Sequence, residues 1–462
     1  MINTNFAQEL KDQVVGKVYT PADSEYEQAR LPWNRSYSPR PALVVQPESV
    51  ADVVAAVRFA RDNHLGVAAQ TTGHGPQASS DDALLIVMSK LNHVQVDAQA
   101  QTARIEGGAV WQNVLDQALP HGLAPLLGSA PHVGVVGYTL GGGLGWLGRK
   151  YGLAADSVRS VDLVTADGAL VHASADENAD LFWGLRGAGG NFGVVTAIEI
   201  SLYPVAELYG GFMVYPGALA AEALGFYRDW LKTVPDELTS SFAIFNFPDL
   251  PFLPEAIRGQ TQVIVRAGFV GAAADGAAQI QKWLDWRAPL ANTFRLMPFA
   301  EIATINNDPV QPSAGYASNG MFDDLSDEAI AIIVRRASDK SSPVVMHELR
   351  HAGGAISRVA ADANAIGNRD AQFYFTLGGP LFPPNNKDTV AAAIRAYKAE
   401  LQSSFRSGVY LNFMSAGEAG ERVREAYGAG ALDRLLTLKA KYDPDNTFRF
   451  AYPLTAPETT PA

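Results

Sequence analysis

The sequence contains no cysteine among its 462 residues. This absence excludes disulfide bonds, a thiolate nucleophile, and any metal or iron–sulfur site with cysteine ligands. We predict no metal site of another kind. Redox chemistry would therefore have to come from a bound cofactor.

Basic residues are outnumbered: 36 lysines and arginines face 48 aspartates and glutamates, a formal net charge of -12 at pH 7. The pI is near 5.2. Nucleic acids and anionic membranes both attract basic surfaces, so neither is an expected partner. We expect a small-molecule substrate, and the sequence gives no indication of the oligomeric state.

Long apolar runs are also lacking, because no stretch approaches the 18 residues that a membrane-spanning helix needs. The first ten residues do not have the basic and apolar pattern of a signal peptide, so a soluble, cytoplasmic protein is expected. With 47% hydrophobic and 18% charged residues the composition is that of a folded protein. The length favours two or three domains over one core.

The periodicity of apolar residues favours the α+β class. Early in the chain, Ser49 is a candidate N-cap for a helix that ends near Gly66, and short alternating runs follow it. After Pro204 we predict strands at 241–247, 261–269, 344–351, 372–377 and 410–413, and helices at 218–231, 273–284, 328–337 and 387–401. This alternation predicts a domain with a mostly antiparallel sheet.

Two glycine-rich segments stand out. Nine glycines lie between Gly128 and Leu153, and each costs close to 1 kcal/mol in a helix interior relative to alanine, so we expect no stable helix there. A second cluster, at 187–193, precedes a predicted strand at 194–202. Glycine-rich backbone allows a flat or anionic group to approach closely.

A nicotinamide cofactor is one possibility, since Gly143 to Gly148 has the spacing GxGxxG and Asp162 follows. A Rossmann fingerprint, however, joins a strand to a helix within a βαβ unit. Irregular sequence follows Gly148, so this possibility is disfavoured.

The chain resembles the FAD-linked oxidases of the vanillyl-alcohol oxidase and berberine-bridge-enzyme-like superfamily. The resemblance rests on five blocks in the family's order: 40–47, 72–75, the glycine stretch with 149–152, 186–193, and 441–446. It implies a two-lobed FAD-binding domain of the PCMH type, formed by residues 1–205 and by a C-terminal segment at 405–462. Residues 206–404 would form the substrate domain.

In that family the histidine of the first loop is bonded covalently to the 8α-methyl group of the flavin, and the matching residue is His74. Many relatives have a second link through a cysteine, at the position of Ala130 here. Without a cysteine only a single link is possible, which is similar to the monocovalent branch. The alternative for His74 is a buried histidine in a turn.

The resemblance also implies which residues contact FAD. Phosphate contacts are expected from the backbone of Thr71, Thr72, Gly73 and Gly75, and contacts to the rings from Gly137, Tyr138, Gly142, Gly145, Val195 and Asn412. Each glycine is equally compatible with a simple turn. Family members commonly have an asparagine after Phe-Arg-Phe, where this chain has Ala451, so the C-terminal contacts stay open.

Val133 occupies the position where oxidases of the family tend to have a small residue that guards oxygen access, and dehydrogenases a bulkier one. This position favours an oxidase. The alternative is that Val133 only packs against its neighbours.

The base is expected on the substrate side of the flavin. The two-residue period of a strand places Glu348 and Arg350 on one face; they are either a base and its charge partner or a structural ion pair. Tyr410 and Asn412 match the family's Tyr-x-Asn pattern beside the flavin, and Tyr410 is either a proton acceptor, a substrate anchor or a packing residue.

We therefore predict an oxidase that transfers hydride from an alcohol or amine C–H to the flavin and then reduces molecular oxygen to hydrogen peroxide. The aromatic residues Tyr138, Phe373 and Tyr374 are predicted to line the pocket. Three alternatives remain: a flavin-dependent dehydrogenase with another acceptor, a nicotinamide-dependent dehydrogenase, and a non-catalytic flavin-binding protein. The sequence does not specify the substrate.

Overall fold

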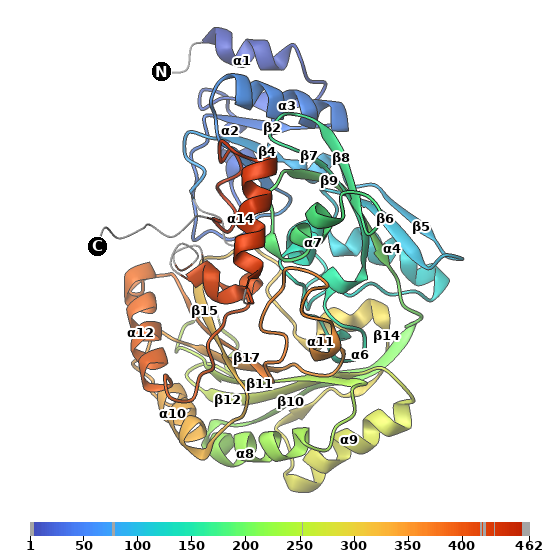
Figure 1. The fold of residues 1–462 in the computed structure, drawn as a ribbon. Coiled ribbons are helices and arrows are strands. Elements are labelled where there is room, and N and C mark those ends of the chain that lie inside the picture. Colours follow the sequence, from blue (N-terminus) through green and yellow to red (C-terminus); the bar gives the residue numbers. More distant parts are fainter. Residues whose placement is uncertain are drawn as a thin grey trace.

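The computed structural model describes residues 4–75, 79–251, 253–415, 418, 422–428 and 430–454. Three β-sheets form its framework, and helices pack on each of them (Figure 1). Both parallel and antiparallel pairing occur, and helices and strands are mixed along the chain. The predicted α+β class is confirmed.

The N-terminal sheet has the strand order β1-β2-β4-β3, and β2, β4 and β3 run parallel. Its elements are α1 (Thr4–Lys11), β1 (Lys17–Tyr19), α2 (Tyr26–Arg30), β2 (Leu43–Gln46), α3 (Val50–Asp62), β3 (Val67–Gln70) and β4 (Leu84–Val87). Ser49 caps α3 as predicted, since its side chain accepts a hydrogen bond from the Asp52 N–H. The end of β3 leads directly into the loop that carries His74.

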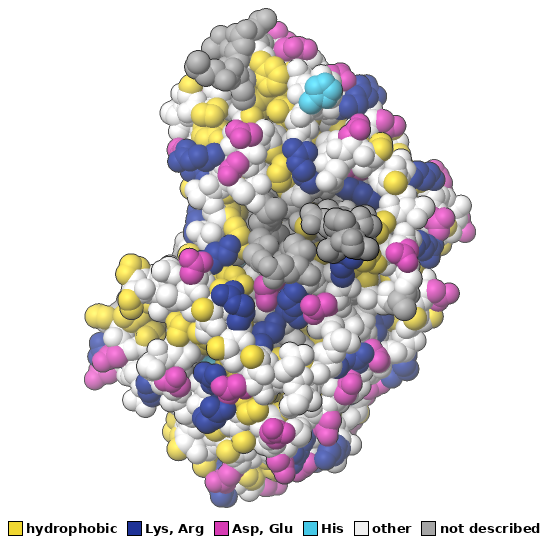
Figure 2. Space-filling view, turned by 60° about the vertical axis from the view of Figure 1, so that its left-hand side comes forward, with side chains coloured by type: hydrophobic (Ala, Val, Ile, Leu, Met, Phe, Trp, Pro, Cys, Tyr) yellow, Lys and Arg dark blue, Asp and Glu magenta, His cyan; other side chains and the backbone are white. Residues whose placement is uncertain are grey.

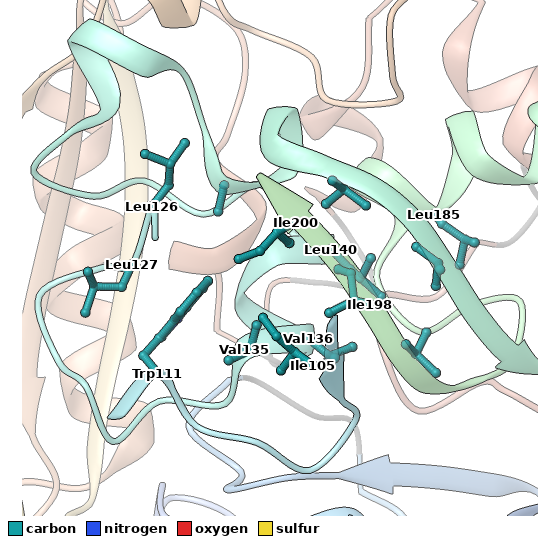
Figure 3. Close-up of a cluster of buried hydrophobic side chains, with 14 of the residues drawn as sticks. Ile105, Trp111, Leu126, Leu127, Val135, Val136, Leu140, Leu185, Ile198 and Ile200 are labelled. Carbon is teal, nitrogen blue, oxygen red and sulfur yellow. The ribbon is translucent and has the colours of Figure 1, made fainter. Parts of the chain in front are cut away.

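The second sheet is antiparallel and has the order β5-β6-β9-β7-β8. Its elements are β5 (Val94–Asp97), β6 (Thr102–Glu106), α4 (Trp111–Ala118), β7 (Val158–Val164), β8 (Leu170–Ser174), α7 (Ala179–Ala188) and β9 (Val194–Ser201). Figure 3 shows part of its core, where Trp111 and Leu140 lie among side chains of β6 and β9. This core supports one side of the glycine-rich segment.

The glycine-rich segment contains two short helices, α5 (Val135–Leu140) and α6 (Gly148–Tyr151). The expectation of no helix there was wrong. Only Gly137 lies inside α5, and the buried side chains of Val135 and Leu140 fix the helix against the core. Tertiary packing thus outweighs the low helix propensity of a single glycine.

The third sheet has eight antiparallel strands in the order β13-β10-β12-β11-β16-β17-β15, with β14 also paired to β10. The strands are β10 (Glu207–Pro216), β11 (Leu238–Asn246), β12 (Thr261–Phe269), β13 (Ala291–Asn292), β14 (Arg295–Pro298), β15 (Gly315–Phe322), β16 (Met346–His351) and β17 (Phe373–Pro380). Helices α8 (Ala220–Leu231), α9 (Ala273–Trp286), α10 (Asp327–Ala337) and α12 (Lys387–Glu400) cover one face (Figure 1). The other face is turned toward the rest of the molecule, next to α6 and α11 (Ala355–Arg358).

The predicted strand at 410–413 was wrong, because Leu411–Phe413 form a 3-10 turn. Alternation over four residues does not distinguish a strand from a turn. Beyond it, α14 (Ala431–Tyr442) packs beside α7, so the C-terminal segment returns to the second sheet (Figure 1).

The surface in Figure 2 mixes acidic and basic side chains, and its described part shows no continuous basic face. Among the residues that the structure describes, no helix is long and apolar enough to cross a membrane.

Candidate cofactor and substrate site

A large cavity of about 350 Å³ lies between the first two sheets, the glycine-rich segment and the C-terminal segment. Its walls include twelve of the predicted site residues: Thr71, Thr72, Gly73, His74, Gly75, Val133, Gly137, Tyr138, Val195, Arg350, Tyr410 and Asn412. Among its described lining residues, Arg350 is the only one that carries a formal charge at pH 7 with histidine neutral. The predicted residues are therefore brought together, with three exceptions.

His74 stands in a small cluster of rings. Its ring stacks on Trp33, with centroids 4.3 Å apart, and lies 4.9 Å from the ring of His132. Its Nδ1 is 2.7 Å from Thr72 Oγ1, whereas Nε2 is buried and has no hydrogen-bond partner among the described residues. Burial, with a smaller effect of His132, lowers the pKa of His74 to about 4. At neutral pH the imidazole is uncharged, and Nε2 keeps a lone pair when Nδ1–H donates to Thr72.

Gly137 and Gly75 leave open space in the cavity wall. A Cβ built on either residue meets no atom within 4 Å. Gly189 and Gly190 also line the cavity, and added Cβ atoms there lie 3.3 Å or more from the nearest atom. These glycines leave a bare backbone cradle, which a flat ring system or a pyrophosphate can approach closely.

Gly142 and Gly145 do not belong to that cradle, and neither lines the large cavity. Gly142 has a φ of +121°, and a Cβ there would lie 2.9 Å from the ring of Tyr410. A Cβ on Gly145 would lie 1.9 Å from the Leu127 carbonyl oxygen. Both glycines allow protein groups to approach each other, and the structure does not place them in the cavity wall, so their contact with the cofactor stays a prediction.

Tyr410 is buried and lines the cavity, and its ring lies beside the backbone of Gly142. Burial raises its pKa, the nearby Tyr374 adds to this, and hydrogen bonds from the backbone of Gly143 and Leu144 and from Asn412 act in the opposite direction. These N–H donors favour the phenolate form of Tyr410. Burial outweighs them, so the net shift raises the pKa of Tyr410 and its hydroxyl is protonated at neutral pH.

Asn412 links Tyr410 to the cofactor cavity. Its Nδ2 donates to the Tyr138 carbonyl oxygen at 2.8 Å and lies 3.5 Å from Tyr410 Oη. Behind Tyr410, the ring of Tyr374 stacks at 5.0 Å. Tyr374 and Phe373 do not line the cavity. Phe373 points to the core under the helices, so of the three predicted aromatic residues only Tyr138 is a wall residue.

Glu348 is the third exception, since it lies outside the lining of the large cavity. Its carboxylate accepts from Arg350 Nε at 3.0 Å and from Arg266 Nη1 at 3.4 Å. The carboxylate is thus held between two guanidinium groups in a buried ion-pair cluster. This geometry favours the ion-pair interpretation of Glu348 and leaves Tyr410 as the better candidate for the base.

Several wall residues were missed by sequence reasoning. Phe450, Ala451 and Tyr452 line the cavity, although Ala451 stands where the family has its asparagine. Gly189 and Gly190 belong to the second glycine cluster, which was noticed but not assigned residue by residue. For the C-terminal residues the sequence carried no signal beyond their position after the 441–446 block.

The cavity fits an extended, partly polar cofactor such as FAD. Besides His74 Nε2, the buried atoms Gln70 Oε1 and Tyr138 Oη find no partner within the described ranges, and both residues line the cavity. Unsatisfied polar atoms are rare in folded proteins and indicate places where a ligand completes the hydrogen bonding. The described residues contain no cluster of three or more side chains that could hold a metal ion.

Comparison with known proteins agrees with this geometry. Residues 41–174 match the family described as FAD binding domain, and residues 409–454 match the family described as berberine and berberine like. Both segments contribute to the cavity. The chain is thus similar to FAD-linked oxidoreductases, and its two matched segments fit the vanillyl-alcohol oxidase and berberine-bridge-enzyme-like superfamily.

Among individual proteins, the chain is 28% identical to (R)-6-hydroxynicotine oxidase of Paenarthrobacter nicotinovorans, over 95% of this chain and 96% of that one. The crystal structure of 6-hydroxy-D-nicotine oxidase from Arthrobacter nicotinovorans superposes with a TM-score of 0.83 at 26% identity, covering 96% and 98% of the two chains. The fold is also shared with glucooligosaccharide oxidase from Acremonium strictum, which has 6-S-cysteinyl, 8α-N1-histidyl FAD. The TM-score is 0.82 at 24% identity, and the match covers 98% of this chain and 99% of that one.

Proposed function

We propose that the protein is an oxidase whose FAD is bonded covalently to His74 alone. The observation that carries this proposal is the buried, uncharged imidazole with an unpartnered Nε2 in the wall of a glycine-lined cavity. A neutral imidazole is a nucleophile, whereas a protonated one is not. Histidyl attachment in glucooligosaccharide oxidase supports the assignment. The second link of that protein has no counterpart, because this chain has no cysteine.

Bound flavin would accept a hydride from a substrate C–H and pass two electrons on to molecular oxygen, giving hydrogen peroxide. The protein has to orient the substrate and remove the second proton. Tyr410 Oη, in its ionised form, takes the proton of the substrate hydroxyl or amine while the C–H hydrogen leaves as hydride, so that a C=O or C=N bond forms. The N–H groups of Gly143 and Leu144 favour the phenolate that this step needs, against the larger effect of burial, which raises the pKa of Tyr410.

Val133 supports oxygen as the electron acceptor. Its half-buried side chain lies on the cavity wall, and its backbone N–H donates to the Ala130 carbonyl oxygen at 3.2 Å. The position is thus held by the loop itself and carries a side chain of moderate size. A nicotinamide-dependent mechanism is disfavoured, because Gly148 starts a helix of only four residues in a segment with no preceding strand.

The attachment is tested on denatured protein. We expect yellow fluorescence to stay with the wild-type polypeptide after denaturation and to be lost in His74→Ala, while the neighbouring variant His132→Asn keeps it. Peptide mapping should place the flavin on the peptide that contains His74. Free flavin released from the wild type would overturn the covalent bond, and a protein purified without flavin would overturn the function.

Oxygen use is tested separately with a panel of alcohol and amine donors. We expect a donor that reduces the flavin anaerobically to give hydrogen peroxide when air is admitted. Rapid reoxidation by a quinone or dye, together with slow reoxidation by air, would identify a dehydrogenase. A yellow protein that no donor reduces would identify a non-catalytic flavoprotein.

A further inference from the structure

A second cavity adjoins the large one at Arg350 and Phe413. It encloses about 180 Å³ and is lined by side chains of four adjacent strands, among them Phe245, Arg266, Met346, Glu348 and Thr376. Arg350 and Phe413 line both cavities. A molecule in the second cavity would therefore reach the cofactor cavity past these two side chains.

The wall of this second cavity contains two arginines, Arg266 and Arg350, and two acids, Glu348 and Asp308, so its formal charges balance. Arg266 and Arg350 share the single carboxylate of Glu348, so the three side chains together carry one positive charge. The second acid of this wall, Asp308, keeps its negative charge and accepts hydrogen bonds from Ser129 Oγ at 2.5 Å and from Asn306 Nδ2 at 2.9 Å. In the described part of the chain, Asp308 forms no ion pair with either arginine within 4 Å.

Arg350 keeps donors available. Its Nε is used by Glu348, and its guanidinium lies 5.1 Å from the centre of the Phe413 ring. Its two terminal amino groups have no hydrogen-bond partner among the residues that the structure describes. Glu348 therefore fixes the side chain and leaves the outer edge of the planar fork free.

Thr376 supplies a second unsatisfied group on the same wall. The residue is 93% buried, and its Oγ1 has no partner in the described ranges. Thr376 is the cross-strand neighbour of Glu348 and lines the second cavity. A free guanidinium edge, a free hydroxyl and an aromatic ring together complement a carboxylate on a small molecule with an apolar or aromatic body.

We propose that the substrate carries a carboxylate, which Arg350 and Thr376 bind in the second cavity while the reacting C–H is held toward Tyr410. The inference rests on the proposed function, because it names the substrate class of the same site. Arg350 and Thr376 are then specificity-determining residues, and Glu348 positions Arg350.

The test uses benzoate and its neutral isostere benzamide as probes on the purified protein, with binding measured by isothermal titration calorimetry. We expect benzoate to bind at least about tenfold more tightly than benzamide, as charge-assisted hydrogen bonds imply. Arg350→Met should remove this preference, and Arg350→Lys should reduce it, because lysine keeps the charge but not the fork. The exposed residue Arg287 is remote from the site, and Arg287→Met is the matched control that should keep the preference.

Thr376→Val gives an independent reading if Arg350→Met fails to fold, since it leaves every charge in place. We expect benzoate affinity to fall about threefold to tenfold with benzamide affinity unchanged. Equal binding of the two probes by the wild type would overturn the proposal. The proposal would also be overturned if Arg350→Met kept the preference for benzoate and had a lowered flavin reduction potential. Arg350 would then serve the cofactor. Flavin content, measured by absorbance, reports separately on whether the proposed function holds.

Discussion

Replacing Tyr410 by phenylalanine removes one hydroxyl and leaves the ring stack on Tyr374, 5.0 Å away, in place. If Tyr410 is the base, the rate of flavin reduction should fall about 10²–10⁴-fold, the usual contribution of a positioned acid–base group. The Gly143 and Leu144 N–H groups lose their acceptor as well, which should cost about 1–3 kcal/mol of stability. Flavin attachment should be unaffected, because His74 is untouched.

The assay is anaerobic stopped-flow reduction by any donor found in the peroxide screen, across a range of pH. Burial raises the pKa of Tyr410, so the wild-type rate should rise with pH as the phenolate forms, and the Tyr410→Phe profile should be flat. Tyr374→Phe is the matched control. Its rate of flavin reduction should stay within about threefold of the wild-type rate, which corresponds to about 0.7 kcal/mol in activation free energy. An equal loss in both variants, or a Tyr410→Phe rate close to wild type, would refute the assignment.

Three further predictions concern the support of the site. Asp443→Asn should lower the free energy of unfolding in urea by about 3–5 kcal/mol, because the buried Lys439, 2.6 Å away, loses its counterion. Gly137→Leu should fold normally but bind little flavin, whereas Gly225→Leu, also helical and unobstructed, should bind it fully. Burial lowers the pKa of His347 to about 3, so only the unfolded state takes up a proton near pH 5. The free energy of unfolding of the wild type should therefore fall by about 2 kcal/mol between pH 8 and pH 5 because of this residue, and this contribution should be absent in His347→Leu.

The sequence predicted most long elements because burial on one face imposes a clear period. Strands β11, β12, β16 and β17 and the four covering helices lie within a few residues of their predicted positions. Strands β10 and β15 were missed: glycines interrupt both, at Gly210, Gly211, Gly315 and Gly320, and weaken the strand pattern. The turn at Leu411–Phe413 was mistaken for a strand, yet Tyr410 and Asn412 still meet, because a short turn also brings residues two apart into contact.

The sequence identified site residues well where the residue type determines the chemistry, and less well where it determines only the shape of the cavity wall. His74 and Tyr410 were chosen for groups that few other residues supply, and both line the cavity. Glu348 was chosen on the same grounds, but its role depends on Arg266, which is 82 residues away in the chain. No local pattern reveals such a partner, so the ion pair could only be left as an alternative.

The glycines show most clearly what the sequence leaves out. Gly137 and Gly142 lie five residues apart in one segment, and both were expected to touch the cofactor. A side chain at Gly137 would enter the cavity, whereas one at Gly142 would collide with the ring of Tyr410. The same missing Cβ thus makes room for a ligand at one position and for the base at the other. Filling Gly137 should therefore lower flavin content, whereas filling Gly142 should displace Tyr410 and slow flavin reduction in protein that has bound its flavin.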